Sequence, residues 1–177
     1  MIDVPGAVDR FERSTRAVLD ALDGVSEQAW NLRPAGAEWS LAETVEHVVL
    51  TDRAVRARLE QLSSRPLDAD TKRFDDAAIC SEMFATAGPP PPGLAEPKGC
   101  FGTPGEGMAA FTEVRDEIVA WVRSSRADLR AHGLPHPVFG VFDGVQWILF
   151  AAAHTDNHLP DLCELRSKIE TAGGPSR

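Results

Sequence analysis

Residues 143–169 read DGVQWILFAAAHTDNHLPDLCELRSKI, and this stretch decides the fold. Apolar side chains return in it every three or four positions, which predicts one long amphipathic helix. Asp143 suits the N-cap position, and Gln146 three residues later completes a capping pair. Pro160 lies inside the pattern and removes a backbone donor. Because the periodicity resumes after it, we expect a kink or a frayed turn there rather than the end of the helix.

Three further helices follow from the same periodicity. The first is predicted from about Val4 to Leu22. The second runs from Ser40 to about Ser63 and opens with an S-x-x-E capping box of Ser40 and Glu43. The third begins at Thr103 and ends at Gly133, and no stretch of the chain predicts a strand. We therefore predict an all-α fold, a four-helix bundle with a long connection between its second and third helices.

The connection from Ser63 to Gly102 has a weak pattern. Its proline-rich run at 87–93 excludes helix and central strand, and a short helical piece is expected between Asp75 and Phe84. A connection this long either carries function or is a passive crossover, and the sequence leaves both open. We predict one domain over residues 1–172 and a disordered tail over residues 173–177.

Charge and hydropathy restrict the partners. The 177-residue chain has a formal net charge of −9. This charge argues against DNA or RNA as a partner, because nucleic-acid binding depends on Lys and Arg. Arg53, Arg56 and Arg58 are interpreted as a solvated helix face. No apolar run reaches membrane-spanning length and the first residues do not resemble a secretory signal, so we expect a cytoplasmic protein without a membrane partner.

The functional prediction centres on His154 and His158. They are four residues apart, so a helix places both imidazoles on one face, where they can bind one transition-metal ion. A third ligand must come from another helix, and His47 in the second predicted helix is the best candidate. Three protein ligands leave coordination positions open. The alternative is that these histidines only pack in the core. A zinc-protease motif is excluded because Thr155 stands where those enzymes need Glu.

Two blocks of the sequence resemble the DinB superfamily in their motifs and their order along the chain. The first block contains RP at 33–34 and WSLAETVEH at 39–47. The second block contains HPVFG at 136–140, QWILF at 146–150 and HTDNH at 154–158.

The resemblance implies a fold and a metal site. The fold would be a four-helix bundle in up-down-down-up order, commonly dimeric, so we expect a homodimer. The site would hold zinc, nickel or a similar divalent ion, with His47, His154 and His158 as its ligands. Two departures from the family pattern are Gln146, which stands where an acidic residue is frequent, and Pro160, which follows the histidine pair.

Other side chains near these motifs receive supporting roles. Asp161 shares the helix face of His154 and His158 and could orient a ligand imidazole by accepting its second N–H. A solvated acid is the alternative for Asp161. His136 is expected to shape a turn rather than to bind metal. Three tryptophans are interpreted as core anchors: Trp39, Trp121 and Trp147.

The expected activity also rests on the resemblance. Characterised members of the superfamily include S-transferases and isomerases that use a low-molecular-weight thiol such as mycothiol, bacillithiol or glutathione. The resemblance therefore implies a metal-dependent thiol S-transferase or isomerase that acts on a small-molecule substrate. Two alternatives stay open, a metal-dependent hydrolase and a non-catalytic, stress-related bundle that only binds metal.

Overall fold

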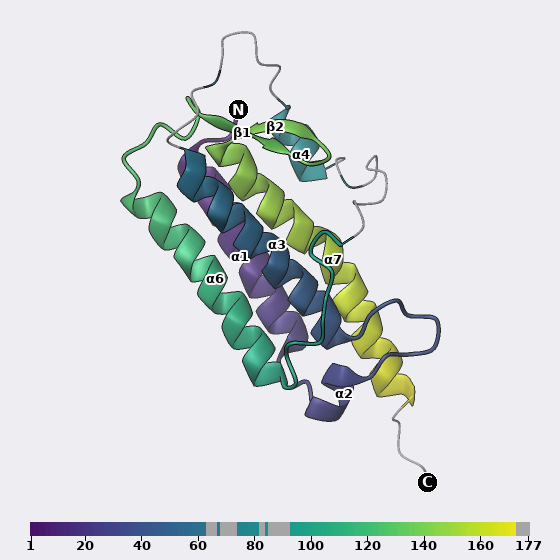
Figure 1. Cartoon of the computed structure of the whole chain (residues 1–177). Coiled ribbons are helices and arrows are strands. Elements are labelled where there is room, and N and C mark those ends of the chain that lie inside the picture. The colour runs from purple at the N-terminus through teal and green to yellow at the C-terminus, as the bar shows by residue number, and fades with distance from the viewer. Residues whose placement is uncertain (63–66, 68–73, 82–83, 85–92, 173–177) are drawn as a thin grey trace.

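Four long helices form most of the structure, which is a computed structural model that describes residues 1–62, 67, 74–81, 84 and 93–172. They are α1 (Val4–Leu22), α3 (Leu41–Gln61), α6 (Pro104–Ser124) and α7 (Gly144–Ala172). They lie side by side (Figure 1), with α1 packed on α7 and α3 packed on both α6 and α7. The mostly helical fold that the sequence predicts is confirmed. None of the helices in the described part of the chain is long and apolar enough to cross a bilayer.

Four short elements join the long helices. They are α2 (Glu27–Asn31), α4 (Asp76–Ser81), β1 (Gly133–His136) and β2 (Gly140–Asp143). The two strands pair antiparallel, so the prediction of an all-α chain without strands is wrong at this point. Gly140 allows the hairpin because its φ of +90° suits glycine best. Four-residue strands are too short for their alternation to be recognised in a sequence.

Side-chain caps set the starts of three long helices. The hydroxyl of Ser40 accepts from the N–H of Glu43, and the Glu43 carboxylate accepts from the N–H of Ser40. Thr103 and Glu106 repeat this exchange at α6. At the start of α7 the N–H of Gln146 donates to the Asp143 carboxylate. These predicted caps are confirmed, and the first of them fixes the register of the helix that carries His47.

Two helices differ from the prediction, α6 in the residue at which it ends and α7 in its course through Pro160. α6 ends at Ser124, and the residues from there to the hairpin form a connection, although the sequence favoured a helix as far as Gly133. α7 continues through Pro160 without interruption. The helix therefore keeps His154 and His158 one turn apart on one face.

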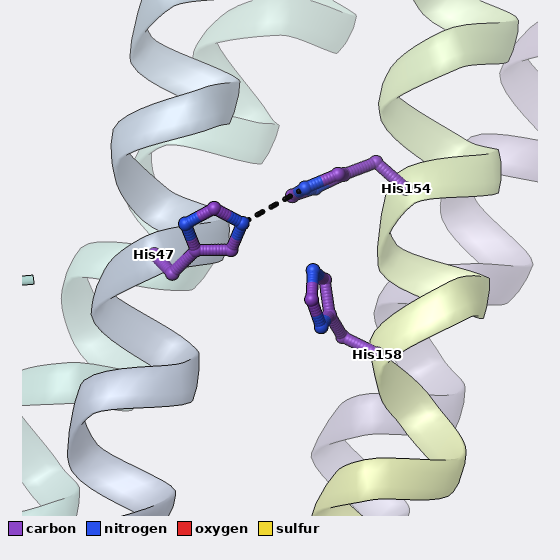
Figure 2. A group of neighbouring side chains, drawn as sticks. All are labelled: His47, His154 and His158. Atoms are coloured by element: carbon purple, nitrogen blue, oxygen red, sulfur yellow. Dashed lines mark hydrogen bonds between the residues drawn. The ribbon is translucent and has the colours of Figure 1, made fainter. Parts of the chain in front are cut away.

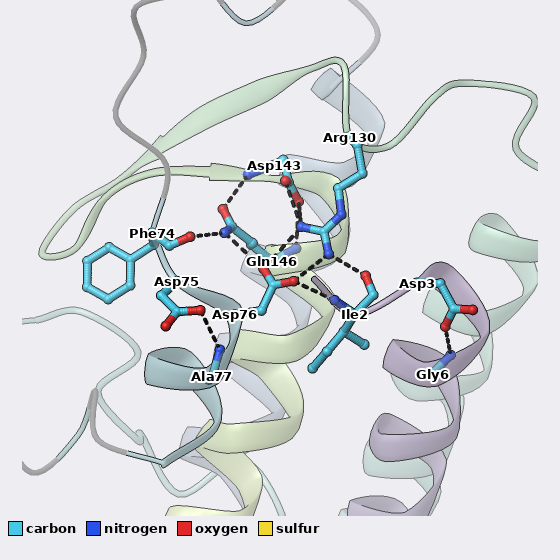
Figure 3. Close-up of polar contacts among 10 residues, drawn as sticks. All are labelled: Ile2, Asp3, Gly6, Phe74, Asp75, Asp76, Ala77, Arg130, Asp143 and Gln146. Atoms are coloured by element: carbon cyan, nitrogen blue, oxygen red, sulfur yellow. Dashed lines mark hydrogen bonds and ion pairs between the residues drawn. The ribbon is translucent and has the colours of Figure 1, made fainter.

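A polar network holds one end of the molecule (Figure 3). The guanidinium of Arg130 pairs with Asp76 at 2.7 Å and with Asp143 at 2.8 Å. The N–H of Ile2 donates to the same Asp76 carboxylate at 2.7 Å. The starts of α1 and α7 therefore meet at this end, together with α4 and the hairpin.

The hydrophobic core consists of two clusters along the helices. The cluster near the hairpin includes Phe11, Leu59, Ile118, Phe142 and Ile148. The cluster near α2 includes Trp30, Leu41, Val49, Phe111 and Leu162. Trp30 packs so closely on α6 that a Cβ at Gly107 would lie 2.4 Å from its ring. This contact requires glycine at that position.

Two predictions concern residues that the structure does not describe. Half of the connection at 63–102 and the tail at 173–177 lie outside the described residues. Within the connection, α4 confirms the short helical piece expected between Asp75 and Phe84. The assignment of residues 1–172 to one domain stays a prediction.

Candidate metal centre

Three imidazoles meet between α3 and α7 (Figure 2). His47 comes from the first half of α3, and His154 and His158 come from successive turns of α7. Each offers one ring nitrogen, and these three atoms lie within 4.8 Å of one another. The Nε2 atoms of His47 and His154 are 3.1 Å apart. The structure therefore brings together the three histidines that the sequence singles out.

Two of the three rings are oriented through their other nitrogen. The Nδ1 atom of His47 donates to the carbonyl of Ala95 at 2.8 Å, so its Nε2 atom turns a lone pair toward the cluster, where it shares a hydrogen bond with Nε2 of His154. The Nδ1 atom of His158 lies 3.3 Å from the carboxylate of Asp161. Asp161 thus contacts the imidazole that it was expected to orient. The Nδ1 atom of His154 is buried and has no hydrogen-bond partner among the described residues.

The cluster has the donor set for a divalent transition-metal ion, and its nitrogens, which lie up to 4.8 Å apart, would have to draw closer around the ion. Zinc–nitrogen bonds of about 2.0–2.1 Å in a tetrahedral site separate two ligand nitrogens by roughly 3.3 Å. The separation of 3.1 Å between the Nε2 atoms of His47 and His154 is close to this value. A backbone carbonyl and a carboxylate on the far nitrogens of His47 and His158 are the supports that metal-bound histidines usually have.

Burial keeps the three imidazoles neutral. It is the largest cause that lowers the pKa of His47 and of His158, and it lowers the pKa of His154 well below the usual value near 6.5. The neighbouring histidines lower the pKa of His154 further, because each would repel a second positive ring. At neutral pH all three imidazoles are therefore uncharged, and an uncharged imidazole can offer one ring nitrogen to a metal ion.

A cavity of about 660 Å³ opens beside the histidines. Trp39 forms part of its wall, with its ring centroid 4.8 Å from that of His47 and 6.3 Å from that of His158. Its interpretation as a core anchor is therefore wrong, whereas Trp147 is both buried and part of the wall. His136 also lines the cavity. Its Nδ1 accepts from the N–H groups of Val138 and Phe139, as expected for a residue that shapes a turn.

Comparison with known proteins identifies the family. A family model described as DinB superfamily matches residues 10–161. The chain belongs to the DinB superfamily. The match includes all three histidines and Asp161. The chain is also similar to the uncharacterised protein YuaE of Bacillus subtilis strain 168, with 26% identity over 162 residues, which are 92% of this chain and 98% of that protein.

Glu46 supports the centre in a way that the sequence did not reveal. In this DinB protein its carboxylate is buried and accepts from the N–H groups of Lys98, Gly99 and Cys100 at 2.8–2.9 Å. Burial alone would raise the pKa of Glu46, but these donors outweigh it and lower the pKa. The segment that Glu46 anchors also carries Ala95, whose carbonyl orients His47.

Ala95 is held in a strained conformation at this contact. Its φ of +52° lies in the left-handed region, which costs a residue other than glycine about 1–2 kcal/mol. Strain of this kind concentrates at functional sites, where the surrounding contacts maintain it. The only signal in the sequence for this support is that a glutamate, Glu46, directly precedes His47. The sequence does not indicate which backbone carbonyl orients the imidazole.

We expect Glu46→Gln to weaken metal binding by about 10-fold. The amide NH2 group of glutamine would face backbone N–H donors, so the segment that carries Ala95 would move and release His47. Competition with a chromophoric chelator would measure the affinity. Glu60→Gln, at an exposed position of the same helix, is the matched control and should leave it unchanged. Equal affinities for Glu46→Gln and Glu60→Gln would contradict the role of Glu46.

The metal-free protein should lose stability as the pH falls below about 6.5. His47, His154 and His158 have lowered pKa values when folded, so unfolding lets them take up protons below their unfolded pKa. Asp52 opposes this trend because burial raises its folded pKa to about 6, and burial raises the pKa of Asp143 as well. His136 adds to the trend as a fourth histidine, because burial lowers its pKa to about 4. Melting temperatures at pH 7.5 and 5.5 with a chelator present would test this. The fall should be smaller for His154→Asn, and equal melting temperatures for the natural protein would contradict the account.

Proposed function

We propose that this DinB protein binds one zinc or nickel ion through His47, His154 and His158, with Asp161 orienting His158. We further propose that it is a thiol S-transferase or isomerase that uses a low-molecular-weight thiol and a small-molecule electrophile. The observation that carries this proposal is three neutral imidazoles in the middle of one cavity whose two ends differ in polarity.

The two ends of the cavity match two different ligands. At the end of the cavity next to the last turns of α7, the lining is polar and includes Glu38, Asp161, Glu164 and Lys168. At the opposite end, next to the first turns of α7, the lining is mostly apolar and includes Phe84, Phe139, Trp147 and Phe150. Low-molecular-weight thiols are rich in amine, hydroxyl and carboxyl groups, so the polar end suits the thiol and the aromatic end suits the electrophile.

The reaction needs a thiolate near an electrophilic carbon. A divalent ion held by the histidines would bind the thiol sulfur and lower its pKa. In an S-transfer the sulfur forms the new bond to carbon, the leaving group departs with its electron pair, and the thiol proton goes to solvent. In an isomerisation the sulfur adds to the substrate and is later expelled. Both reactants would bind in one cavity, whose walls beside the histidines include Trp39 and Phe150.

The helix order and the assembly are part of this proposal. We propose that α1, α3, α6 and α7 follow the up-down-down-up order of a DinB bundle. This is supported by the contact of Leu62, which follows α3, with Gly144 at the start of α7, and by the hydrogen bond from Arg166 to the carbonyl of Ala21 near the ends of α7 and α1. The homodimer is proposed on the family resemblance, and sedimentation analysis would test it.

The activity test uses metal-loaded protein, a panel of thiols and a model electrophile such as 1-chloro-2,4-dinitrobenzene. We expect conjugate formation with at least one thiol, and we expect it to disappear with a chelator or with His47→Ala. Cys163→Ser is the control, because Cys163 is an exposed thiol outside the cavity lining. Absence of a metal-dependent conjugate with every thiol would contradict the proposal, and ester hydrolysis that needs His47 but no thiol would favour a hydrolase instead.

A further inference from the structure

Arg58 lines the same cavity as the histidines. It is eleven residues after His47, and eleven residues are almost three full turns, so both side chains lie on one face of α3. Their positions are about 16 Å apart along the helix axis. The sequence favoured a solvated face for the arginines of this helix. That interpretation holds for the exposed Arg53 but is wrong for Arg58, which is half-buried in the cavity wall.

Among the residues that the structure describes, none pairs with the charge of Arg58. Arg56, two residues earlier, pairs with Glu60 at 2.8 Å. By contrast, Arg58 makes no hydrogen bond or ion pair within the described part of the chain. A half-buried guanidinium has five N–H donors, and it loses part of its hydration in such a position. An anionic ligand would satisfy these donors.

The described cavity walls around Arg58 are mostly apolar. Phe139, Trp147 and Phe150 line this end of the cavity. His136 lines it too, and its Nδ1 atom accepts two backbone N–H groups, so its proton is on Nε2. Burial and the nearby charge of Arg58 lower the pKa of His136 to about 4, which keeps that ring neutral. The acidic residues of the cavity lining lie at the other end, beyond His158.

We propose that the electrophilic substrate is an apolar, preferably aromatic, carboxylic acid whose carboxylate binds Arg58 while its reacting carbon lies at the histidines. This inference rests on the proposed function and names the substrate class for the same site. A single guanidinium matches the single charge and planar shape of a carboxylate. A phosphate dianion would need more cationic donors than these walls provide. Arg58 and His47 are about 16 Å apart along the axis of α3. In the proposed substrate, a chain or a ring therefore separates the carboxylate from the reacting carbon.

Binding of two matched probes tests the inference without any catalysis. The probes are 4-phenylbutyrate and 4-phenylbutan-1-ol, measured by isothermal titration calorimetry on the full chain. We expect the acid to bind at least ~10-fold more tightly than the alcohol, since hydrogen bonds to a charged group are the stronger kind. Arg58→Gln should abolish this preference and leave the affinity for the alcohol unchanged. Arg58→Lys should retain part of it, and the exposed control Arg53→Gln should retain all of it.

His47→Ala separates this inference from the metal proposal. If Arg58 binds the carboxylate, the preference for the acid persists in His47→Ala and disappears in Arg58→Gln. If the preference disappears in His47→Ala but persists in Arg58→Gln, the carboxylate binds at the histidines, and the inference is overturned while the metal site stands. Equal affinities for acid and alcohol in the natural protein would overturn it as well. Helical circular dichroism equal to that of the natural protein shows that each variant is folded.

Discussion

Arg115→Met is expected to lower the free energy of unfolding by about 3–5 kcal/mol. Arg115 is 1% exposed and lies in the middle of the helices. Its guanidinium donates to the Asp52 carboxylate at 3.0 Å and to the Thr155 hydroxyl at 2.7 Å. It also donates to groups of α1, namely Thr15 Oγ1, Ser14 Oγ and the carbonyl of Phe11. One side chain of α6 therefore joins α1, α3 and α7.

The cost arises because the partner of Arg115 cannot reach water. Asp52 is fully buried, and its Oδ1 atom has no hydrogen-bond partner in the described part of the chain. Burial raises the pKa of Asp52 to about 6 even though Arg115 lowers it, so without Arg115 this carboxyl would take up a proton to stay buried. Methionine fills a similar volume but leaves Asp52, Ser14 and Thr155 without their donor.

Urea denaturation of two variants would separate the charge from the packing. Asp52→Leu combined with Arg115→Met should recover most of the lost stability, because neither charge is then buried alone. A single Arg115→Met variant that stays within about 1 kcal/mol of the natural protein would show that this ion pair does not hold the helices together.

His154→Ala is expected to reduce metal affinity by at least ~100-fold. Loss of a ligand should exceed the 10- to 100-fold effect of losing a group that only orients a ligand. His154 is the most deeply buried of the three histidines, so an exposed side chain cannot take its place as a metal ligand. His136→Gln is the control, since His136 lines the same cavity but is not part of the cluster. Metal content after dialysis would be measured by mass spectrometry under non-denaturing conditions. It should fall in His154→Ala but not in His136→Gln. Equal metal content in both variants would contradict the assignment of His154 as a ligand.

The sequence predicted the features that depend on local pattern. The caps at Ser40, Thr103 and Asp143 rest on contacts within one turn, and the spacing of His154 and His158 rests on helix geometry alone. For the same reason the four long helices were recognised. The approach of His47 to the other two histidines was also predicted, because both sequence blocks, at 33–47 and at 136–158, resemble motifs of the superfamily.

The features that the sequence did not predict depend on contacts between distant segments. The carbonyl of Ala95 reaches His47 only because Glu46 holds that segment on α3. Arg58 looks like any solvated arginine until the cavity beside it is seen. The hairpin after α6 has strands of four residues, and its position is set by the network around Arg130 rather than by its own pattern.

A crystal structure of the protein grown with zinc or nickel, with anomalous data at the metal edge, tests the central claim most directly. We predict one strong anomalous peak per chain, about 2.0–2.1 Å from the Nε2 atoms of His47, His154 and His158, with open coordination positions on the cavity side. An anomalous map without a peak at these three nitrogens, or with its peak at other residues, would contradict it.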